Sequence, residues 1–396
     1  MSRVGIVIVG GGLAAQRCAQ TLRARGYEGA VRIVCGEPEP PYDRPPLSKE
    51  LLAGEVEEES IALRPPAWYE ENEIDLILGR RATRLDPATK RLELDDGTPL
   101  PYERLLIATG SQARRLPDLE GWPNVHYLRT VAEARRLRAE LRPGARLVIV
   151  GAGFIGQEVA ATARQAGAEV TIVEALAAPL GPILGEEVGR WLVELHRGRD
   201  VRVLLSARLS RAHGNGRVDE LVLEDGRRLG CDAVVVGIGV APAAQWLAGS
   251  GLEPDGVLTD PAGRTSAPDV FAAGDVARSF DPRFGLHARA EHWEAAARQG
   301  ASAARAMLGE DPAPPPLPSF WSDQYGHRIQ YVGHAEHADD ARVESDPDGR
   351  DLRVVYRRQG RPVAALVVDR PRELVALRRE IDLSDHRNDD EKEVEP

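Results

Sequence analysis

The stretch VGIVIVGGGLAA at residues 4–15 decides the fold of this chain. An apolar strand runs into three glycines, and the spacing G-x-G-x-x-A places a tight turn between this strand and a helix. Gly10 permits the turn, and Gly12 lacks a side chain, so a pyrophosphate can approach the backbone. Ala15 lets the helix pack close to the strand, and the free N–H groups at the helix start favour a phosphate. The residues expected to hold a dinucleotide here are Gly10, Gly12, Leu13, Ala14 and Ala15.

A second stretch of the same kind, RLVIVGAGFIG, occupies residues 146–156 and has the full G-x-G-x-x-G spacing. One such loop is a weak signal, because glycine-rich turns are common, whereas two loops in a strand–turn–helix context are a strong one. Two dinucleotides bound at once usually mean hydride transfer between a nicotinamide and a flavin. The residues expected to hold the second dinucleotide are Gly151, Gly153, Phe154, Ile155 and Gly156.

Each loop is followed by a second apolar strand that ends in an acid. Residues 31–37 end at Glu37, and residues 169–174 end at Glu174. A carboxylate at this position accepts hydrogen bonds from ribose hydroxyls and repels a 2′-phosphate. The alternative interpretation of either loop is a strand–helix–strand turn that binds no ligand. This interpretation explains one loop alone much better than it explains both loops together.

Composition and charge limit the classes of protein that fit. A chain of 396 residues is too long for one hydrophobic core and fits two or three domains. The formal net charge of −11 argues against a general nucleic-acid binder, although arginine pairs leave room for a local basic patch. No apolar run approaches the roughly 20 residues that span a bilayer, and no signal peptide is recognisable. We therefore expect a cytoplasmic protein that binds neither nucleic acid nor a membrane.

The cysteines and histidines give no evidence for a metal centre. The three cysteines form no C-x-x-C pair, which argues against a disulfide framework, a zinc site, an iron–sulfur cluster and a redox-active disulfide. They are Cys18, Cys35 and Cys231. His334 and His337 flank Glu336, but this spacing is loose, and we predict no metal site.

The order of the patterns predicts an α/β fold with two Rossmann-like dinucleotide-binding domains and a small C-terminal α+β domain. The first nucleotide-binding domain is expected to be discontinuous, over residues 1–112 and 245–318, with the second at 113–244. A proline-rich linker then leads to the C-terminal domain at 319–384. Residues 385–396 are acidic and contain few apolar side chains, so we expect a disordered tail.

Periodicity and turn residues also predict individual elements. Expected strands include residues 74–78, 83–86, 91–94, 104–110, 233–239, 269–275, 329–332, 352–357 and 363–368. Expected helices include residues 131–141, 291–307 and 371–380, and Ser48 is expected to cap a helix that follows it.

Several motifs in a fixed order resemble one known family over nearly the whole chain. They are the run from Arg44 to Lys49 (RPPLSK), ATG at 108–110, GFIGQE at 153–158, GIGVAP at 237–242, AGD at 273–275 and WSDQ at 321–324. The chain resembles the FAD-dependent ferredoxin reductases that serve Rieske dioxygenases and bacterial cytochromes P450. This group includes reductases of the putidaredoxin and rubredoxin type and belongs to the glutathione-reductase structural class.

The resemblance implies a role for each motif. It assigns the first loop to FAD and the second to NADH, with Lys49 near the flavin N5 and Glu158 paired with that lysine. Asp275 would contact the ribityl or pyrophosphate region, and the main chain at Trp293 would meet the isoalloxazine. The remaining positions that it assigns to cofactor contacts are Arg44, Ala82, Arg129 and Gly239.

The chain also departs from the family pattern. Ala15 stands where many relatives have glycine. Residues 175–185 lack the arginine that many relatives place after the acid of the NADH site, so the contacts of the coenzyme differ there. Residues 196–201 match only approximately the family's His-x-x-x-Gly-Val stretch.

The resemblance implies that electrons pass from NADH through FAD to a small two-iron, two-sulfur ferredoxin, which feeds an oxygenase. Rubredoxin reductase and NADH oxidase remain alternative enzymes, and a redox-sensing flavoprotein of the apoptosis-inducing type is an alternative of another class. Arg64, Arg80 and Arg81 could dock an acidic ferredoxin or form a solvated face, and Trp321 could cover the flavin edge. We expect a monomer or a weak homodimer.

Overall fold

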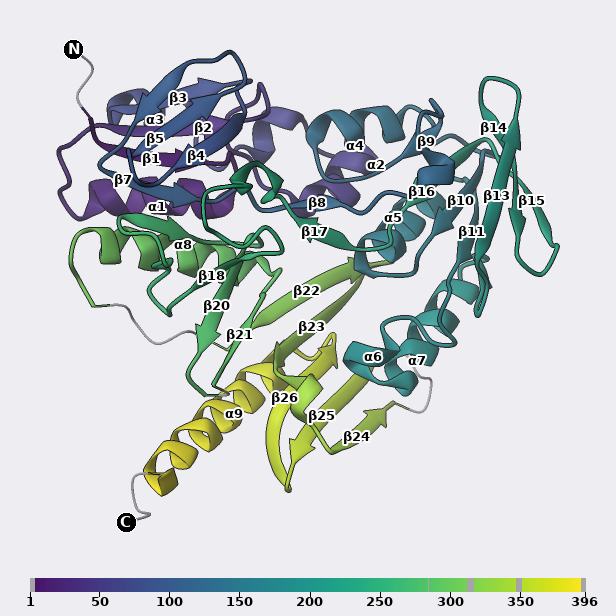
Figure 1. The fold of residues 1–396 in the computed structure, drawn as a ribbon. Coiled ribbons are helices and arrows are strands. Elements are labelled where there is room, and N and C mark those ends of the chain that lie inside the picture. Colours follow the sequence, from purple (N-terminus) through teal and green to yellow (C-terminus); the bar gives the residue numbers. More distant parts are fainter. Residues whose placement is uncertain (1–3, 284, 312–316, 347–350, 393–396) are drawn as a thin grey trace. The chain divides into compact units, whose positions relative to one another are not determined.

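The computed structural model describes residues 4–283, 285–311, 317–346 and 351–392, with side chains described as far as Asp382. The chain forms two compact units (Figure 1). Unit 1 comprises Met1–Asp43, Glu59–Gln112 and Ala241–Pro318, and unit 2 comprises Arg44–Glu58, Ala113–Val240 and Ser319–Pro396. Within the described part of the chain, no helix is both long and apolar enough to cross a membrane.

Unit 1 is built on a parallel sheet with the strand order β19-β7-β1-β2-β3. The strands, in that order, are Val270–Ala272, Arg104–Ile107, Ile6–Val9, Val31–Cys35 and Ile74–Leu78. Both faces of β1 are buried, because Ile6 and Ile8 pack into one hydrophobic cluster while Val7 and Val9 pack into another. This burial explains the continuous apolar sequence of the strand.

Helices α1 (Leu13–Ala24) and α8 (Trp293–Met307) pack side by side in unit 1 (Figure 1). Their contact is close, because a Cβ atom at Gly300 would lie only 2.2 Å from the carbonyl oxygen of Ala14. Alanines on both helices pack against Ile6 and Ile8 of the sheet. The small residues therefore hold the phosphate-loop helix α1 firmly against the sheet.

The rest of unit 1 consists of two small sheets and short helices. An antiparallel sheet contains β4 (Ala82–Asp86), β5 (Arg91–Leu94) and β6 (Pro99–Pro101). A second small sheet contains β18 (Val257–Thr259), β20 (Ala277–Asp281) and β21 (Leu286–Ala288). The short helices are α3 (Pro66–Glu71), η4 (Gln245–Leu247) and η2 (Glu58–Ile61), which begins at the boundary with unit 2.

Unit 2 contains a second parallel sheet with the order β12-β11-β10-β16-β9. Its strands are Arg202–Leu204, Glu169–Val173, Arg146–Val150, Ala233–Val236 and Val125–His126. Helices α4 (Val131–Arg138), α5 (Phe154–Gln165) and α7 (Glu186–Arg197) accompany this sheet. An antiparallel sheet of β13 (Leu209–Gly214), β14 (Val218–Leu223) and β15 (Arg228–Gly230) completes this part of the chain.

Unit 2 also contains an antiparallel sheet with the order β22-β23-β26-β25-β24. The strands are Ser319–Gln324, His327–Gly333, Arg361–Val368, Leu352–Arg358 and Asp340–Ser345, and α9 (Pro371–Lys392) follows them. The short elements of unit 2 are η1 (Pro45–Ser48), α2 (Glu50–Ala53), η3 (Pro117–Leu119), α6 (Gly181–Leu184) and η5 (Ala335–His337). Strands β8 (Ser111–Ala113) and β17 (Val240–Pro242) lie where the chain passes between the units.

The predicted fold class is confirmed, because both parallel sheets and the mixed α and β content of the C-terminal segment are present. Several boundaries differ from the predicted ones. Helix α4 ends at Arg138 rather than at residue 141, and α9 continues to Lys392 rather than ending at residue 380. No glycine or proline interrupts residues 372–395, so the helix extends into the tail for which we predicted disorder. Residues 393–396 of that tail lie outside the described residues.

Candidate functional site

The first glycine loop joins β1 to α1 in unit 1. Gly10 has φ +129°, and a Cβ atom there would lie 2.1 Å from the carbonyl oxygen of Ala108. Gly12 has an extended backbone, and a Cβ atom there would meet nothing within 4 Å. No side chain caps the N-terminus of α1. Gly10 is therefore required by the turn, whereas Gly12 leaves open space beside the N–H groups of the helix, as a pyrophosphate requires.

The second loop, in unit 2, also contains glycines that the backbone requires and one glycine that leaves open space. Gly151 has φ +101°, and a Cβ atom there would lie 2.4 Å from the carbonyl oxygen of Gly237. A Cβ atom at Gly156 would lie 2.2 Å from the oxygen of Gly151, so only glycine allows α5 to pack this close to the turn. At Gly153 the nearest atom would be 3.7 Å away. The second loop thus also offers an open position at the start of its helix.

The two acids lie at the carboxyl ends of the second strands, as predicted. Glu174 follows β11 directly and is 8% exposed. Its Oε2 accepts the N–H of Ala152 at 2.7 Å, and its Oε1 accepts the N–H of Leu176 at 2.8 Å. These bonds fix the carboxylate beside the second glycine loop. Glu37 follows β2 and accepts a hydrogen bond from Tyr42 Oη at 2.5 Å.

Other predicted FAD contacts in unit 1 lie near the carboxyl end of its parallel sheet. Asp275 follows β19, and its Oδ2 accepts a hydrogen bond from Ser111 Oγ at 2.8 Å. Trp293 begins α8, and its Nε1 donates to Asp43 Oδ1 at 2.6 Å. Ala82 is the first residue of β4.

Two predicted arginines meet in unit 2. The Arg44 guanidinium donates to the backbone oxygen of Arg129. The N–H of Arg129 in turn donates to Glu133 Oε2 at 2.9 Å, next to the capping box that starts α4. Gly239, which has φ +93°, accepts a backbone hydrogen bond from Arg114.

The predicted Lys49–Glu158 pair is present in unit 2. Lys49 Nζ lies 2.7 Å from Glu158 Oε2, and the two side chains are only 11% and 3% exposed. Ser48 Oγ donates to the same carboxylate oxygen at 2.5 Å, and Ser322 Oγ donates to Glu158 Oε1 at 2.7 Å. A buried carboxylate needs partners of this kind, because an unpaired buried charge is very costly.

Sequence reasoning missed both serines as partners of Glu158. The prediction that Ser48 caps the following helix is wrong, because Lys49 occupies the N-cap position of α2 and no side chain caps it. The hydroxyl of Ser48 instead reaches Glu158, which lies 110 residues further along the chain. The signals present in the sequence were the position of Ser48 beside Lys49 and that of Ser322 within the WSDQ motif.

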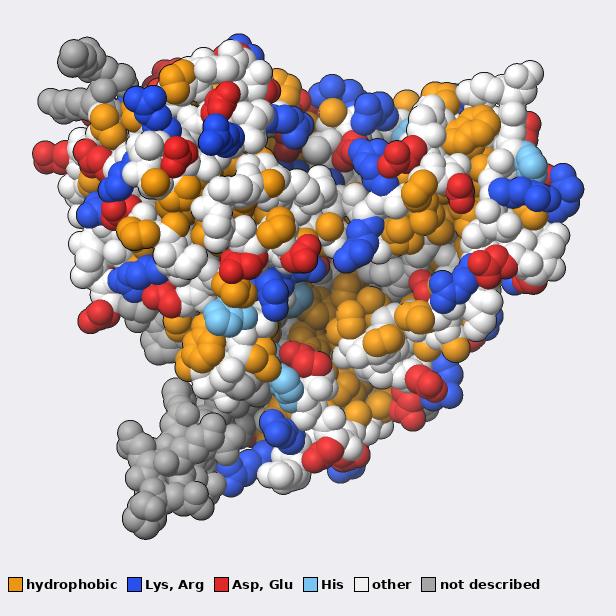
Figure 2. Space-filling model, in the orientation of Figure 1, with side chains coloured by type: hydrophobic (Ala, Val, Ile, Leu, Met, Phe, Trp, Pro, Cys, Tyr) orange, Lys and Arg blue, Asp and Glu red, His pale blue; other side chains and the backbone are white. Residues whose placement is uncertain are grey.

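The three arginines considered for docking have different surroundings in unit 1. The Arg64 guanidinium lies 5.7 Å from the centre of the Trp68 ring, and Arg80 pairs with Asp96 at 3.2 Å. The Arg81 side chain lies beside Gly36. Figure 2 shows basic and acidic side chains interspersed over the visible face, without a broad field of one sign. In unit 2, Arg328 lies 5.7 Å from the Trp321 ring.

Among the described residues, His334, Glu336 and His337 form the one cluster of three potential metal ligands. His334 Nδ1 lies 3.0 Å from Glu336 Oε1, whereas His337 Nε2 is 4.0 Å from it. Metal–ligand bonds of 2.0–2.1 Å in a tetrahedral zinc site imply ligand atoms about 3.4 Å apart. The cluster is therefore better described as histidines paired with a carboxylate, and that pairing lowers the pKa of Glu336 although burial opposes it.

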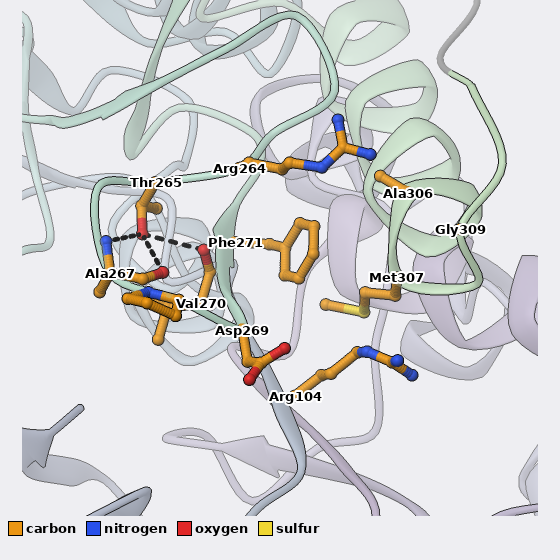
Figure 3. Close-up of a pocket in the computed structure, with 11 residues that line it drawn as sticks. Arg104, Arg264, Thr265, Ala267, Asp269, Val270, Phe271, Ala306, Met307 and Gly309 are labelled. Carbon is orange, nitrogen blue, oxygen red and sulfur yellow. Dashed lines mark hydrogen bonds between the residues drawn. The ribbon is translucent and has the colours of Figure 1, made fainter. Parts of the chain in front are cut away.

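A pocket of about 310 Å³ lies in unit 1 at the amino ends of β7 and β19 (Figure 3). Phe271 and Met307 line it together with the guanidinium groups of Arg104 and Arg264. The glycine loop and Asp275 follow the carboxyl ends of strands in the same sheet. Of the predicted cofactor residues, all of which the structure describes, none lines this pocket. It is therefore distinct from the dinucleotide site.

The comparisons with known proteins agree with this geometry. A family model described as pyridine nucleotide-disulphide oxidoreductase matches residues 4–300, and a reductase C-terminal model matches residues 319–393. The chain belongs to the pyridine nucleotide-disulphide oxidoreductase family. It is an oxidoreductase of a family that binds FAD and uses NAD(H), so the cofactor prediction from the two loops is confirmed. The open positions at Gly12 and Gly153 fit these two cofactors.

Relatives in this family cover nearly the whole chain. The ferredoxin–NAD(+) reductase component of the anthranilate 1,2-dioxygenase system of Burkholderia cepacia is 41% identical over 96% of this chain and 94% of its own length. The corresponding component of the biphenyl dioxygenase system of Paraburkholderia xenovorans (strain LB400) is 41% identical over 93% and 90%. The solved structure of a covalent putidaredoxin reductase–putidaredoxin complex matches with a TM-score of 0.93 and 34% identity, covering 96% of this chain and 93% of that one. The resemblance inferred from the motifs is thereby confirmed.

Proposed function

We propose that the protein passes electrons from NADH through FAD to a small two-iron, two-sulfur ferredoxin that feeds an oxygenase. The observation that carries this proposal is that each unit contains a dinucleotide loop and that unit 2 contains the buried Lys49–Glu158 pair, whereas the cysteines form no thiol pair. All three cysteines lie in the described part of the chain and are free and buried. Burial raises the pKa of Cys231 to about 11 and that of Cys35 to about 12. A disulfide-reducing route through protein thiols is therefore disfavoured.

FAD bound here would supply the conversion between the two-electron chemistry of a nicotinamide and the one-electron chemistry of an iron–sulfur protein. The residues of this chain contribute position and charge. The first loop and Asp275 would hold FAD, and the second loop would hold NADH. Lys49 would place a positive charge near the flavin ring, which favours the electron-rich reduced form. Glu158 keeps this ammonium in place through the 2.7 Å contact.

Glu174 supports the choice of NADH. Its carboxylate is fixed beside the second loop by the N–H groups of Ala152 and Leu176. A fixed negative charge at the end of the second strand would repel the 2′-phosphate of NADPH. Residues 175–185 contain no arginine or lysine that could offset this charge.

The relatives support the ferredoxin partner. Two proteins that are 41% identical to this chain are named as ferredoxin–NAD(+) reductase components of dioxygenase systems. We further propose a cytoplasmic monomer or weak homodimer. We also propose three functional domains, with FAD bound by residues 1–112 and 245–318, NADH by 113–244, and a C-terminal domain at 319–384.

Steady-state reduction of cytochrome c by NADH, measured with and without a two-iron, two-sulfur ferredoxin, tests this function. We expect the rate to depend on the ferredoxin and to saturate with its concentration. A protein that reduces ferricyanide with NADH but shows no ferredoxin-dependent rate would contradict the proposal. Rapid NADH consumption with oxygen alone would instead support an oxidase.

A further inference from the structure

Lysine is very rare in this chain. Of its 51 basic residues only three are lysine, namely Lys49, Lys90 and Lys392. A lysine ammonium is a compact charge with three rotatable donors, whereas arginine presents a planar fork. Two of the Lys49 donors are used, by Glu158 at 2.7 Å and by the backbone oxygen of Pro45 at 3.2 Å. The third N–H of the ammonium has neither of these partners. Its direction is set by the other two bonds, and therefore depends on how firmly Glu158 itself is held.

Strand β22 packs along the first turns of α5 with matching spacing. The ring of Phe320 lies 4.6 Å from the ring of Phe154, and Ser322 Oγ lies 2.7 Å from Glu158 Oε1. Two residues along a strand advance about 6.6 Å, and four residues along a helix advance about 6 Å. The two contacts therefore lie in register, and the same strand supports both the loop residue Phe154 and the partner of Lys49.

The direction of the Ser322 hydroxyl is set by its neighbour. Gln324 Nε2 donates to Ser322 Oγ at 3.2 Å, so the single hydroxyl hydrogen is available for Glu158. A hydroxyl carries one donor hydrogen and two acceptor lone pairs, and these two bonds use the hydrogen and one of the lone pairs. Ser322 is fully buried, and Gln324 is 1% exposed, so water does not replace these bonds.

We propose that Ser322 is a positioning residue for the Lys49 ammonium and acts through Glu158. This inference rests on the proposed function in assigning Lys49 to the flavin site. Glu158 Oε2 already receives Lys49 and Ser48, and Ser322 provides the bond to the other oxygen, Oε1. Holding both oxygens prevents the carboxylate from rotating, and this keeps the direction of the Lys49 ammonium fixed.

The backbone of β22 does not depend on the hydroxyl. All six residues of the strand pair with β23, from Ser319 opposite Val332 to Gln324 opposite His327. Replacing Ser322 by alanine removes the hydroxyl but leaves this ladder intact. The substitution is therefore expected to act on the Glu158 carboxylate rather than on the fold.

The test compares Ser322→Ala with Ser319→Ala, a matched control three residues away on the other face of the same strand. In Ser322→Ala we expect flavin reduction by NADH to slow about three- to tenfold, because one charge-assisted bond is lost while two remain. We expect the flavin midpoint potential to shift as well, with the KM for NADH nearly unchanged. Ser319→Ala is expected to leave all three quantities at their wild-type values.

A double-mutant cycle separates positioning from a structural role. In a Lys49→Met background, Ser322→Ala is expected to have no further effect on the reduction rate or the potential, because the group through which it acts is gone. Equal effects in both backgrounds, or no effect in the wild-type background, would overturn the inference.

Chemical labelling provides a readout that needs neither NADH nor ferredoxin. Because lysines are so few, acetylation of Lys49 can be followed by peptide mass spectrometry against Lys90, whose side chain is 44% exposed. We expect Ser322→Ala to raise the Lys49 labelling rate relative to Lys90 several-fold, and an unchanged ratio would also overturn the inference. Loss of ferredoxin turnover with the labelling result intact would overturn the proposed function alone.

Discussion

The substitution Gly12→Val separates cofactor binding from folding. The backbone at Gly12 has φ −104° and ψ −171°, an extended conformation that valine adopts readily. A Cβ atom there would meet nothing within 4 Å, so the folded chain accommodates the side chain. The same side chain would fill the space that the pyrophosphate of FAD needs. We therefore expect a stable protein that has lost its flavin.

The magnitude follows from the hydrogen bonds that the pyrophosphate would lose. Displacing it breaks about two charge-assisted bonds from backbone N–H groups, each worth roughly 1.5–3 kcal/mol. The sum of about 3–6 kcal/mol corresponds to roughly two to four orders of magnitude in the dissociation constant of FAD. The urea midpoint of the FAD-free protein is expected to stay unchanged.

Two further glycines serve as controls. Gly153→Val makes the equivalent change in the second loop, where the nearest atom to a Cβ would be 3.7 Å away. It is expected to keep FAD and to raise the KM for NADH. Gly10→Ala is expected to destabilise the fold itself, because its Cβ would lie 2.1 Å from the oxygen of Ala108. The assay is visible flavin absorption per purified chain, followed by titration of FAD into the FAD-free protein. A full complement of flavin in Gly12→Val would refute the assignment of the first loop.

Four other predictions follow from the same structure. Lys49→Met should slow flavin reduction by NADH about ten- to a hundredfold in stopped-flow measurements and lower the flavin midpoint potential. An unchanged rate would contradict the assignment of Lys49 to the flavin site. The fixed carboxylate of Glu174 should give NADH a higher kcat/KM than NADPH, and the opposite preference would contradict its assigned role. Burial lowers the pKa of His196 from 6.5 to about 4, so the unfolded chain takes up a proton before the folded one as the pH falls. At pH 5 this lowers the free energy of unfolding by roughly 2 kcal/mol. In urea unfolding, His196→Gln should therefore lose less stability than the wild type between pH 7 and pH 5. Neutralising Arg80 and Arg81 together should raise the KM for ferredoxin at low salt and leave ferricyanide reduction intact, whereas equal loss of both activities would mark them as structural.

The parallel sheets were predictable because central strands such as β1, β2 and β16 are buried on both faces. Apolar runs such as Ile6–Val9 and Ala233–Val236 have the length and composition of fully buried strands, and each glycine loop marks the start of the following helix. The positive φ angles at Gly10 and Gly151 also follow from the motif alone. These local signals were enough to predict the strand–turn–helix geometry of both glycine loops.

The C-terminal sheet was predicted only in part. Strand β22 went unnoticed because its inward positions 322 and 324 carry serine and glutamine, which serve Glu158 and break the expected apolar alternation. Strand β24 lies at the edge of the sheet and is mostly exposed, so its sequence has no buried face. The contacts of Ser48 and Ser322 with Glu158 join residues more than a hundred positions apart, and no local pattern encodes them.

The interleaved path of the chain limits how this protein can be divided. Three segments of unit 1 alternate with three of unit 2, so the polypeptide passes between the units five times. A gene fragment that ends near residue 112 would retain Lys49 but lack both Glu158 and Ser322. Neither unit can therefore be expressed as one contiguous piece. Engineering that exchanges the surroundings of Lys49 between relatives must transplant residues 44–58 together with α5 and β22, because these three separate stretches of the gene form one spatial module.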